Sequence, residues 1–340
     1  MKKITFHFSK VSTDCYFGAR FSQLKKLTDP KKTVLVTDEH VYKAHAPLFK
    51  RWNCIVLRAG EDYKVQATVD ALLEQLILMG VDRQFTLVGV GGGVVTDLTG
   101  YAASIYMRGI RCGFVPTSLL AMVDASLGGK NGVDIGLYKN LAGTIRQPSF
   151  LLFDVDLLSS LPLKEWRNGF AEIIKHASLF DRKLFKELGK NDLVTYRKNS
   201  VLLQALIKKN VLIKLKLVVK DEFESGERRL LNFGHTLGHA LEKQYEISHG
   251  EAISIGMTVA AQLSEQLCGF SQRELLVSLL HNYGLPTYAS YNAKKVLKVL
   301  AMDKKKSGNA VHYILLKDIA RPVQERISFN KLEKLITSLS

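Results

Sequence analysis

An apolar strand, a run of glycines and a helix follow one another without interruption in LVGVGGGVVTDLTGYAAS, residues 87–104. The glycines permit a tight turn and a close approach of the backbone to a ligand, and the first turn of the helix offers free N–H groups. The segment predicts a parallel sheet with a phosphate- or dinucleotide-binding turn. Because Val94 stands at the last glycine position of GxGxxG, an ordinary strand-to-helix turn remains the alternative.

The rhythm of the apolar residues changes near residue 150. Before it, short apolar runs alternate with helical patterns, and after it almost every long segment has helical periodicity. The predicted strands are 4–8, 33–38, 54–60, 85–91 and 112–118, and the predicted helices are 65–80, 163–180, 200–223, 236–245 and 251–269. We therefore expect an α/β fold with a Rossmann-like parallel-sheet domain over residues 1–150 and a mainly α-helical domain over residues 151–340. Ligands are expected in a cleft between the two.

Length and composition favour a cytoplasmic globular protein. A chain of 340 residues with 46% hydrophobic and 24% charged residues suits two domains. No apolar run approaches the 18 residues of a membrane span, and the N-terminal segment lacks the apolar core of a signal peptide. The four cysteines form no CxxC pair, so we expect reduced, mostly buried thiols.

The chain carries a net charge of +16, which favours anionic partners. The basic residues are scattered, and their longest run, 304–306, has three members. No helix-turn-helix or zinc-finger spacing is present, so we expect a phosphorylated small molecule as the partner, and neither nucleic acid nor a membrane.

Three of the nine histidines lie within residues 231–252, at 235, 239 and 249. His235 and His239 are four residues apart, on one face of a helix, but Thr236 takes the place of the glutamate of HExxH. Glu172 with His235 and one of the other two histidines would form a carboxylate–imidazole set typical of catalytic zinc. Glycines beside these histidines would let two helices pack closely around a shared ion.

Polar side chains cluster near glycine-rich turns after the first glycine segment. Arg108, Lys130, Lys139 and Asn140 are suited to bind phosphate and carboxylate groups. Each lysine alone would more often be a solvated surface residue, and their concentration within about forty residues favours an anion site.

Eight motifs in this order resemble those of the 3-dehydroquinate synthases, a branch of the sugar-phosphate cyclase family. They extend over most of the chain: GEDYK (60–64), GGGVVTDLTGYAAS (91–104), YMRGI (106–110), PTSLLAMVDASLGGKNGVD (116–134), KNLAG (139–143), GFAEIIKHA (169–177), RRLLNFGHTLGHA (228–240) and HGEA (249–252). The combination is specific, although no single motif would be.

The resemblance implies a role for each matching position. Glu172, His235 and His249 would bind the metal, a zinc or cobalt ion, and His239 would belong to the catalytic machinery together with Lys130, Asn140 and Glu224. The implied substrate-binding residues are Arg108, Asp124, Lys175, Lys214, Arg228 and Asn232. The implied NAD-binding residues are Asp38, Glu61, Lys64, Gly92, Gly93, Val94, Val95, Thr96, Asp97, Thr117, Ser118, Lys130, Lys139 and Ser160.

The chemistry implied by the resemblance is a redox-neutral cascade that converts 3-deoxy-D-arabino-heptulosonate 7-phosphate to 3-dehydroquinate in the shikimate pathway. NAD⁺ oxidises a hydroxyl group, phosphate leaves, the hydride returns and the ring closes by an aldol step. A homodimer is expected from the same resemblance. A sibling cyclase and a metal-dependent polyol dehydrogenase are the alternatives; the dehydrogenase would accumulate NADH and would not need the anion-binding residues.

Four local features depart from the family pattern, one of which is Ser160, where threonine is usual and the hydroxyl is kept. Asn131 replaces the usual hydroxyl residue, Leu237 replaces a common aromatic residue, and the segment between His239 and His249 is short. These departures leave the implied ligand set intact and bear on the shape of the cofactor pocket and on how His249 is presented.

Overall fold

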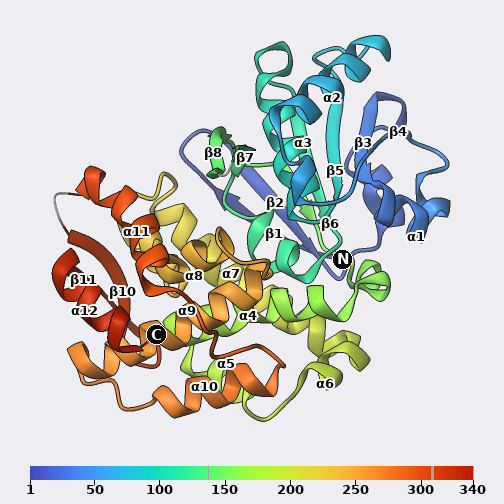
Figure 1. Ribbon diagram of the computed structural model, residues 1–340. Helices are drawn as coiled ribbons and strands as arrows, with labels where there is room; N and C mark the ends of the chain where they lie inside the picture. The colour runs from blue at the N-terminus through green and yellow to red at the C-terminus, as the bar shows by residue number, and fades with distance from the viewer. Residues whose placement is uncertain (137, 308–309, 340) are drawn as a thin grey trace. The chain divides into compact units, whose positions relative to one another are not determined.

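The computed structural model describes residues 1–136, 138–307 and 310–339 (Figure 1). The chain folds into two units, each of which packs mainly on itself. The first contains residues 1–166 and 199–223, and the second contains residues 167–198 and 224–340. The predicted domain boundary near residue 150 stays a prediction.

A seven-stranded sheet forms the centre of the first unit, in the order β1-β2-β9-β6-β5-β3-β4. β1 and β2 are antiparallel, and the other neighbours are parallel. The strands are β1 (Lys2–His7), β2 (Ser12–Phe17), β3 (Thr33–Asp38), β4 (Asn53–Leu57), β5 (Thr86–Gly91), β6 (Arg111–Pro116) and β9 (Phe150–Leu152). A separate antiparallel pair joins β7 (Lys130–Ile135) to β8 (Tyr138–Ile145).

The central strands are buried on both faces, as their continuous apolar sequences predict. Every residue of β5 is buried, as are the first five residues of β3. The helices of this unit are α1 (Glu39–Phe49), α2 (Gln66–Leu78), α3 (Gly93–Ile105) and α7 (Ser200–Lys220). Leu35, Val88 and Val115 of the sheet pack in one core with Phe21 and Phe49.

The strand order creates a ligand-binding edge. Five of the parallel strands, β4, β3, β5, β6 and β9, have the 2-1-3-4-5 order of doubly wound folds, in which β3 and β5 are neighbours although their connections leave in opposite directions. Ligands bind such sheets where the carboxyl ends of these two strands diverge. Asp38 ends β3 and Gly91 ends β5, so both lie at this edge. This confirms the α/β fold that the sequence predicts.

Helices dominate the second unit. They comprise most of α4 (Leu163–Phe180), then α5 (Arg182–Leu188), α6 (Leu193–Lys198), α8 (His235–Glu242), α9 (His249–Cys268), α10 (Arg273–Asn282), α11 (Ala293–Ser307) and α12 (Phe329–Leu339). One antiparallel hairpin, β10 (Ala310–Asp318) with β11 (Arg321–Ser328), adds strands that the helical prediction for residues 151–340 did not include. No helix among the described residues has the length and apolar character to cross a membrane.

Glycines bring α8 and α9 into backbone contact. A Cβ atom at Gly256 would lie 1.9 Å from the carbonyl oxygen of Gly234, and one at Gly238 would lie 2.9 Å from that of Ala252. Neither position tolerates a side chain, because real Cβ atoms do not approach backbone oxygens so closely. The close packing predicted from glycines beside the histidines is therefore present.

We predict that Gly256→Ala lowers the free energy of unfolding by about 2–3 kcal/mol, because its new methyl group forces α9 away from Gly234. Gly189→Ala is the matched control: its backbone is right-handed, and its nearest neighbour would be 3.6 Å away. Urea denaturation followed by circular dichroism measures both. Equal midpoints for the two variants would contradict the backbone contact.

All four cysteines are free thiols, as predicted, but burial differs among them. Cys15 and Cys112 are buried, and burial raises the pKa of Cys112 to about 12. We predict that these two resist a disulfide-exchange reagent at pH 8 until the protein is unfolded, whereas Cys54 and Cys268 react slowly in the native state. Four thiols reacting at the unfolded rate in the native protein would contradict this burial.

Candidate active site

Glu172 is a carboxylate buried in the middle of α4, with no solvent exposure. Lys175, one helical turn later, forms an ion pair with it and is 1% exposed. A buried carboxylate remains ionised only where cations or hydrogen-bond donors surround it. The position of Glu172 therefore requires basic groups around it, and the two helices α8 and α9 provide them.

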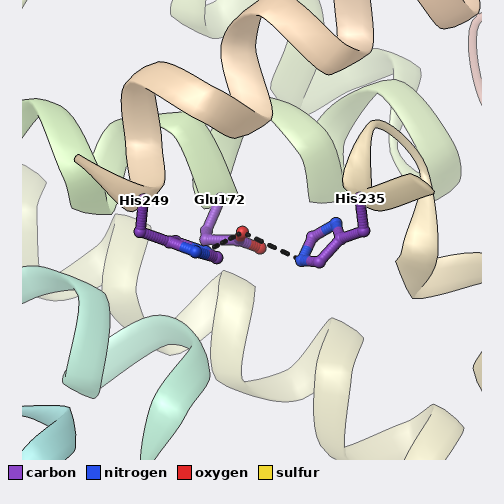
Figure 2. Close-up of side chains that lie close together, drawn as sticks. All are labelled: Glu172, His235 and His249. Atoms are coloured by element: carbon purple, nitrogen blue, oxygen red, sulfur yellow. Dashed lines mark hydrogen bonds and ion pairs between the residues drawn. The ribbon is translucent and has the colours of Figure 1, made fainter. Parts of the chain in front are cut away.

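Two imidazole rings approach Glu172 from different helices. His249 Nε2 lies 3.1 Å from Glu172 Oε1, and His235 Nε2 lies 3.7 Å from the same oxygen. Figure 2 shows the carboxylate lying between the two rings. One ligand atom from each of the three residues lies within 4.8 Å of the others. The structure thus brings together the three residues implied as metal ligands, which are far apart in the sequence.

The starts of helices α8 and α9 determine the positions of His235 and His249. Gly234, in the left-handed conformation, begins α8, so His235 is the first residue of that helix. His249 is the first residue of α9. Ser248 caps this helix, because the backbone N–H and the hydroxyl of Ser248 both donate to the Glu251 carboxylate. The backbone N–H of Gly250, the residue after His249, donates to Asn168 Oδ1 on α4 at 3.0 Å. These contacts hold the segment that presents His249.

His239 lies beside the group without joining it. Its ring centroid is 5.0 Å from that of His235 and 6.5 Å from that of His249. Among the described residues, His239 is not part of the set whose ligand atoms lie within 4.8 Å. Sequence spacing left His239 and His249 as equal candidates for the third ligand, and the geometry favours His249.

The two histidines of the group differ in their ionisation. Burial and the Lys175 ammonium hold the pKa of His235 well below its usual range. Burial also acts to lower the pKa of His249, but the carboxylates of Glu172 and Glu242 outweigh it and raise that pKa to about 9. A metal binds the neutral imidazole, so His249 would have to release a proton before it could bind an ion, whereas His235 would not. Two imidazoles and one carboxylate are a donor set that fits zinc or a similar divalent ion.

The glycine turn after β5 forms the second candidate site. A Cβ atom at Gly91 would lie 2.5 Å from Val95, so this position requires glycine. Around Gly92, by contrast, the nearest atom to such a Cβ is the Ser118 hydroxyl at 3.5 Å. The carbonyl of Gly91 accepts a hydrogen bond from the Thr117 N–H, which connects the ends of β5 and β6. The turn leaves the first N–H groups of α3 near the ligand-binding edge of the sheet.

Lys64 connects three predicted site residues. Its ammonium lies 2.6 Å from Asp97 Oδ2, 2.6 Å from Asn140 Oδ1 and 4.0 Å from Glu61. Burial raises the pKa of Asp97 to about 6 against the opposing effect of Lys64. Asn140 has a left-handed backbone (φ 53°) and is held by Asp134, which accepts from its N–H. A strained residue tied to a buried ion pair is typical of a binding site.

The other predicted NAD-binding residues occupy the same edge or the nearby surface. Asp38 caps α1 by accepting from the Val41 N–H at 2.9 Å. Ser160 contacts His45 through its hydroxyl, and Thr96 is buried with its hydroxyl donating to the Gly93 carbonyl. The first turn of α3 also holds Gly93, Val94 and Val95, whereas Lys139 is exposed on β8.

The predicted anion-binding residues form pairs within each unit. In the first unit, Lys214 Nζ lies 2.6 Å from Asp124 Oδ1 and also donates to the Asp124 carbonyl. In the second unit, Asn232 donates to Glu224 Oε1 at 2.9 Å, and Arg228 is 2% exposed. Buried cations of this kind are suited to anionic ligands.

Arg108 and Lys130, two further residues of the predicted site, belong to the first unit. Arg108 follows the C-terminus of α3, which is 13 residues and hence about 20 Å long, so it is at the far end of that helix from Gly92. It has a left-handed backbone (φ 63°). Lys130 is exposed at the start of β7. Their predicted contacts with substrate stay predictions.

Two residues to which the sequence assigned no role support the candidate sites. Asn131, noted only as a departure, is buried and donates to the carbonyls of Gly129 and Arg146, so it holds the β7–β8 hairpin. Glu242 lies at the C-terminal end of α8, with its carboxylate 3.7 Å from His249 Nδ1. Its position three residues after His239 and seven after His235 places it on the histidine face of the helix, which was the available signal.

Comparison with known proteins identifies the family. The family model described as 3-dehydroquinate synthase N-terminal matches residues 54–168, and the one described as 3-dehydroquinate synthase C-terminal matches residues 169–306. The 3-dehydroquinate synthase of Thermodesulfovibrio yellowstonii is 39% identical over 329 residues, which cover 93% of this chain and 91% of the relative.

Two solved structures share the fold. The 2-epi-5-epi-valiolone synthase of Streptomyces hygroscopicus, with NAD⁺ and Zn²⁺ bound, has a TM-score of 0.86 and 26% identity, and covers 100% of this chain and 99% of its own. A 2-deoxy-scyllo-inosose synthase complexed with carbaglucose-6-phosphate, NAD⁺ and Co²⁺ has a TM-score of 0.85, 24% identity and 99% coverage of both chains. With matches that extend over both family models, the chain belongs to the 3-dehydroquinate synthase family.

Proposed function

We propose that the protein converts 3-deoxy-D-arabino-heptulosonate 7-phosphate to 3-dehydroquinate and phosphate, as a phosphate-eliminating lyase that uses NAD⁺ and a divalent metal. The observation that carries the proposal is the group of Glu172, His235 and His249, whose ligand atoms lie within 4.8 Å. Family membership supplies the substrate, and the donor set supports the metal.

The metal ligands in this proposal are Glu172, His235 and His249. A zinc ion held by them would supply Lewis acidity at the substrate hydroxyl that is oxidised. Lys175, paired with Glu172, would orient that carboxylate. His239, whose ring lies 5.0 Å from that of His235, would hold or move a proton of the substrate.

The NAD⁺ site in this proposal is the carboxyl edge of β3 and β5. Bound NAD⁺ supplies transient hydride acceptance and return. The N-terminus of α3 would receive the pyrophosphate, Asp38 would bind the ribose hydroxyls, and Lys64 would hold Asp97 and Asn140 in place. Lys139, Thr117 and Ser118 would complete the site.

Recognition of the anionic substrate falls to the basic and polar side chains. Lys214, held by Asp124, and the buried Arg228 are the cations that would face phosphate and carboxylate groups. Asn232 with Glu224 would orient substrate hydroxyls or hold a proton. We further propose a homodimer in the cytoplasm, with zinc as the bound metal; light scattering after size-exclusion chromatography tests the dimer.

We predict that the purified protein, with NAD⁺ and Zn²⁺, releases phosphate from the heptulosonate phosphate without net NADH. Chelation lowers the rate about 100-fold or more, since a metal stabilises developing charge by several kcal/mol, and added Zn²⁺ or Co²⁺ restores it. A coupled phosphate assay and absorbance at the NADH band measure both. Net NADH from a simple polyol, with no phosphate release, would instead identify a dehydrogenase.

We predict different defects for two neighbouring histidines. His249→Ala abolishes stoichiometric zinc binding together with activity, because it removes one of three ligands. His239→Ala keeps the zinc and lowers kcat about 10²–10⁴-fold, as expected for lost proton transfer. Metal analysis and steady-state kinetics distinguish these results, with exposed His281→Ala as the control. Equal loss of zinc from both variants would overturn the ligand assignment.

A further inference from the structure

The two histidines of the metal group share one arrangement of their ring nitrogens. In each ring Nε2 faces Glu172, at 3.7 Å for His235 and 3.1 Å for His249. In each ring Nδ1 faces an oxygen on the opposite side. For His235 that oxygen is the carbonyl of Phe233, at 3.2 Å. For His249 it is the Glu242 carboxylate, at 3.7 Å.

This arrangement determines which nitrogen can bind an ion. A neutral imidazole carries one proton, so a nitrogen that binds a metal must leave the proton on the other nitrogen. An oxygen that faces Nδ1 favours the tautomer with Nδ1 protonated and Nε2 free to bind. Carboxylates and carbonyls in this position commonly orient metal-bound histidines and increase their basicity.

The location of Glu242 suits this task. It ends α8, the helix that begins with His235, and its side chain is only 9% exposed. The glycine contacts hold the backbones of α8 and α9 close together, so a side chain at the end of α8 can reach the start of α9. Helix α8 therefore supplies the proposed ligand His235 itself and contacts the proposed ligand His249 through the Glu242 carboxylate.

We infer that Glu242 is a positioning residue for the metal centre, which holds the His249 ring with Nδ1 protonated and Nε2 directed at the ion. The inference rests on the proposed function, because it requires the metal that Glu172, His235 and His249 bind. The 3.7 Å contact is longer than a hydrogen bond, so the inference requires that it shorten to about 2.7–2.9 Å when metal binds.

The test compares Glu242→Gln with Glu246→Gln, a change in an exposed residue four positions later. Glutamine keeps the shape of the side chain but removes the negative charge that stabilises a proton on His249 Nδ1. We expect Glu242→Gln to weaken Zn²⁺ binding about 10- to 100-fold, as measured by competition with a chromophoric chelator, and Glu246→Gln to leave it unchanged. Circular dichroism spectra that match wild type confirm that both variants are folded.

The visible absorption spectrum of bound Co²⁺ distinguishes a positioning role of Glu242 from a role in folding alone, because it changes only when the metal ligands change. Co²⁺-loaded Glu242→Gln should show shifted visible absorption bands relative to wild type, because the orientation of one ligand changes, and Glu242→Asp should recover part of the Zn²⁺ affinity. Wild-type Zn²⁺ affinity and an unchanged cobalt spectrum in Glu242→Gln would overturn this inference alone. Wild-type protein that binds neither ion would overturn the metal centre itself, and this inference with it.

Discussion

Burial of the Glu172 carboxylate is the constraint on which the candidate active site depends. A carboxylate with no solvent exposure is costly unless its charge is compensated, and Lys175, His235 and His249 surround it with basic nitrogens. The imidazoles can reach Glu172 because glycines allow α8 and α9 to pack in backbone contact. Helix packing and histidine orientation are therefore parts of one arrangement, to which a divalent ion in the proposed site would add positive charge beside Glu172.

A different constraint, strand order, produces the candidate nucleotide site of the first unit. Because β3 and β5 are neighbours whose connections diverge, their carboxyl ends leave an edge where α3 begins. Gly91 allows the chain to turn there, and Lys64 ties the start of α3 to β8 through Asp97 and Asn140. Sites of this kind are built from backbone geometry, with few side chains fixing the orientation of the ligand, which explains why glycines carry the strongest signal in this half of the sequence.

Much of this could be predicted from the sequence, because periodicity and residue chemistry are local properties. The strands at 33–38 and 85–91 and the helix at 163–180 have continuous apolar or 3.6-residue patterns, and they are present as predicted. The β7–β8 and β10–β11 hairpins were not predicted: β8 is largely exposed, and β10 lies within a region for which the sequence predicted helices. Spacing alone could not choose between His239 and His249, since that choice depends on how α8 and α9 pack. Glu242 was not predicted, because its partner, His249, lies beyond a turn at the start of the next helix.

The central claim is that Glu172, His235 and His249 hold a divalent ion, with His239 outside the ligand set. X-ray absorption spectroscopy at the zinc edge of the zinc-loaded protein tests it most directly, because imidazole ligands give distinctive outer-shell scattering. The account predicts oxygen and nitrogen ligands at about 2.0–2.2 Å, two of them from imidazoles, and no sulfur. A spectrum that requires three imidazoles would bring His239 into the ligand set and contradict the account.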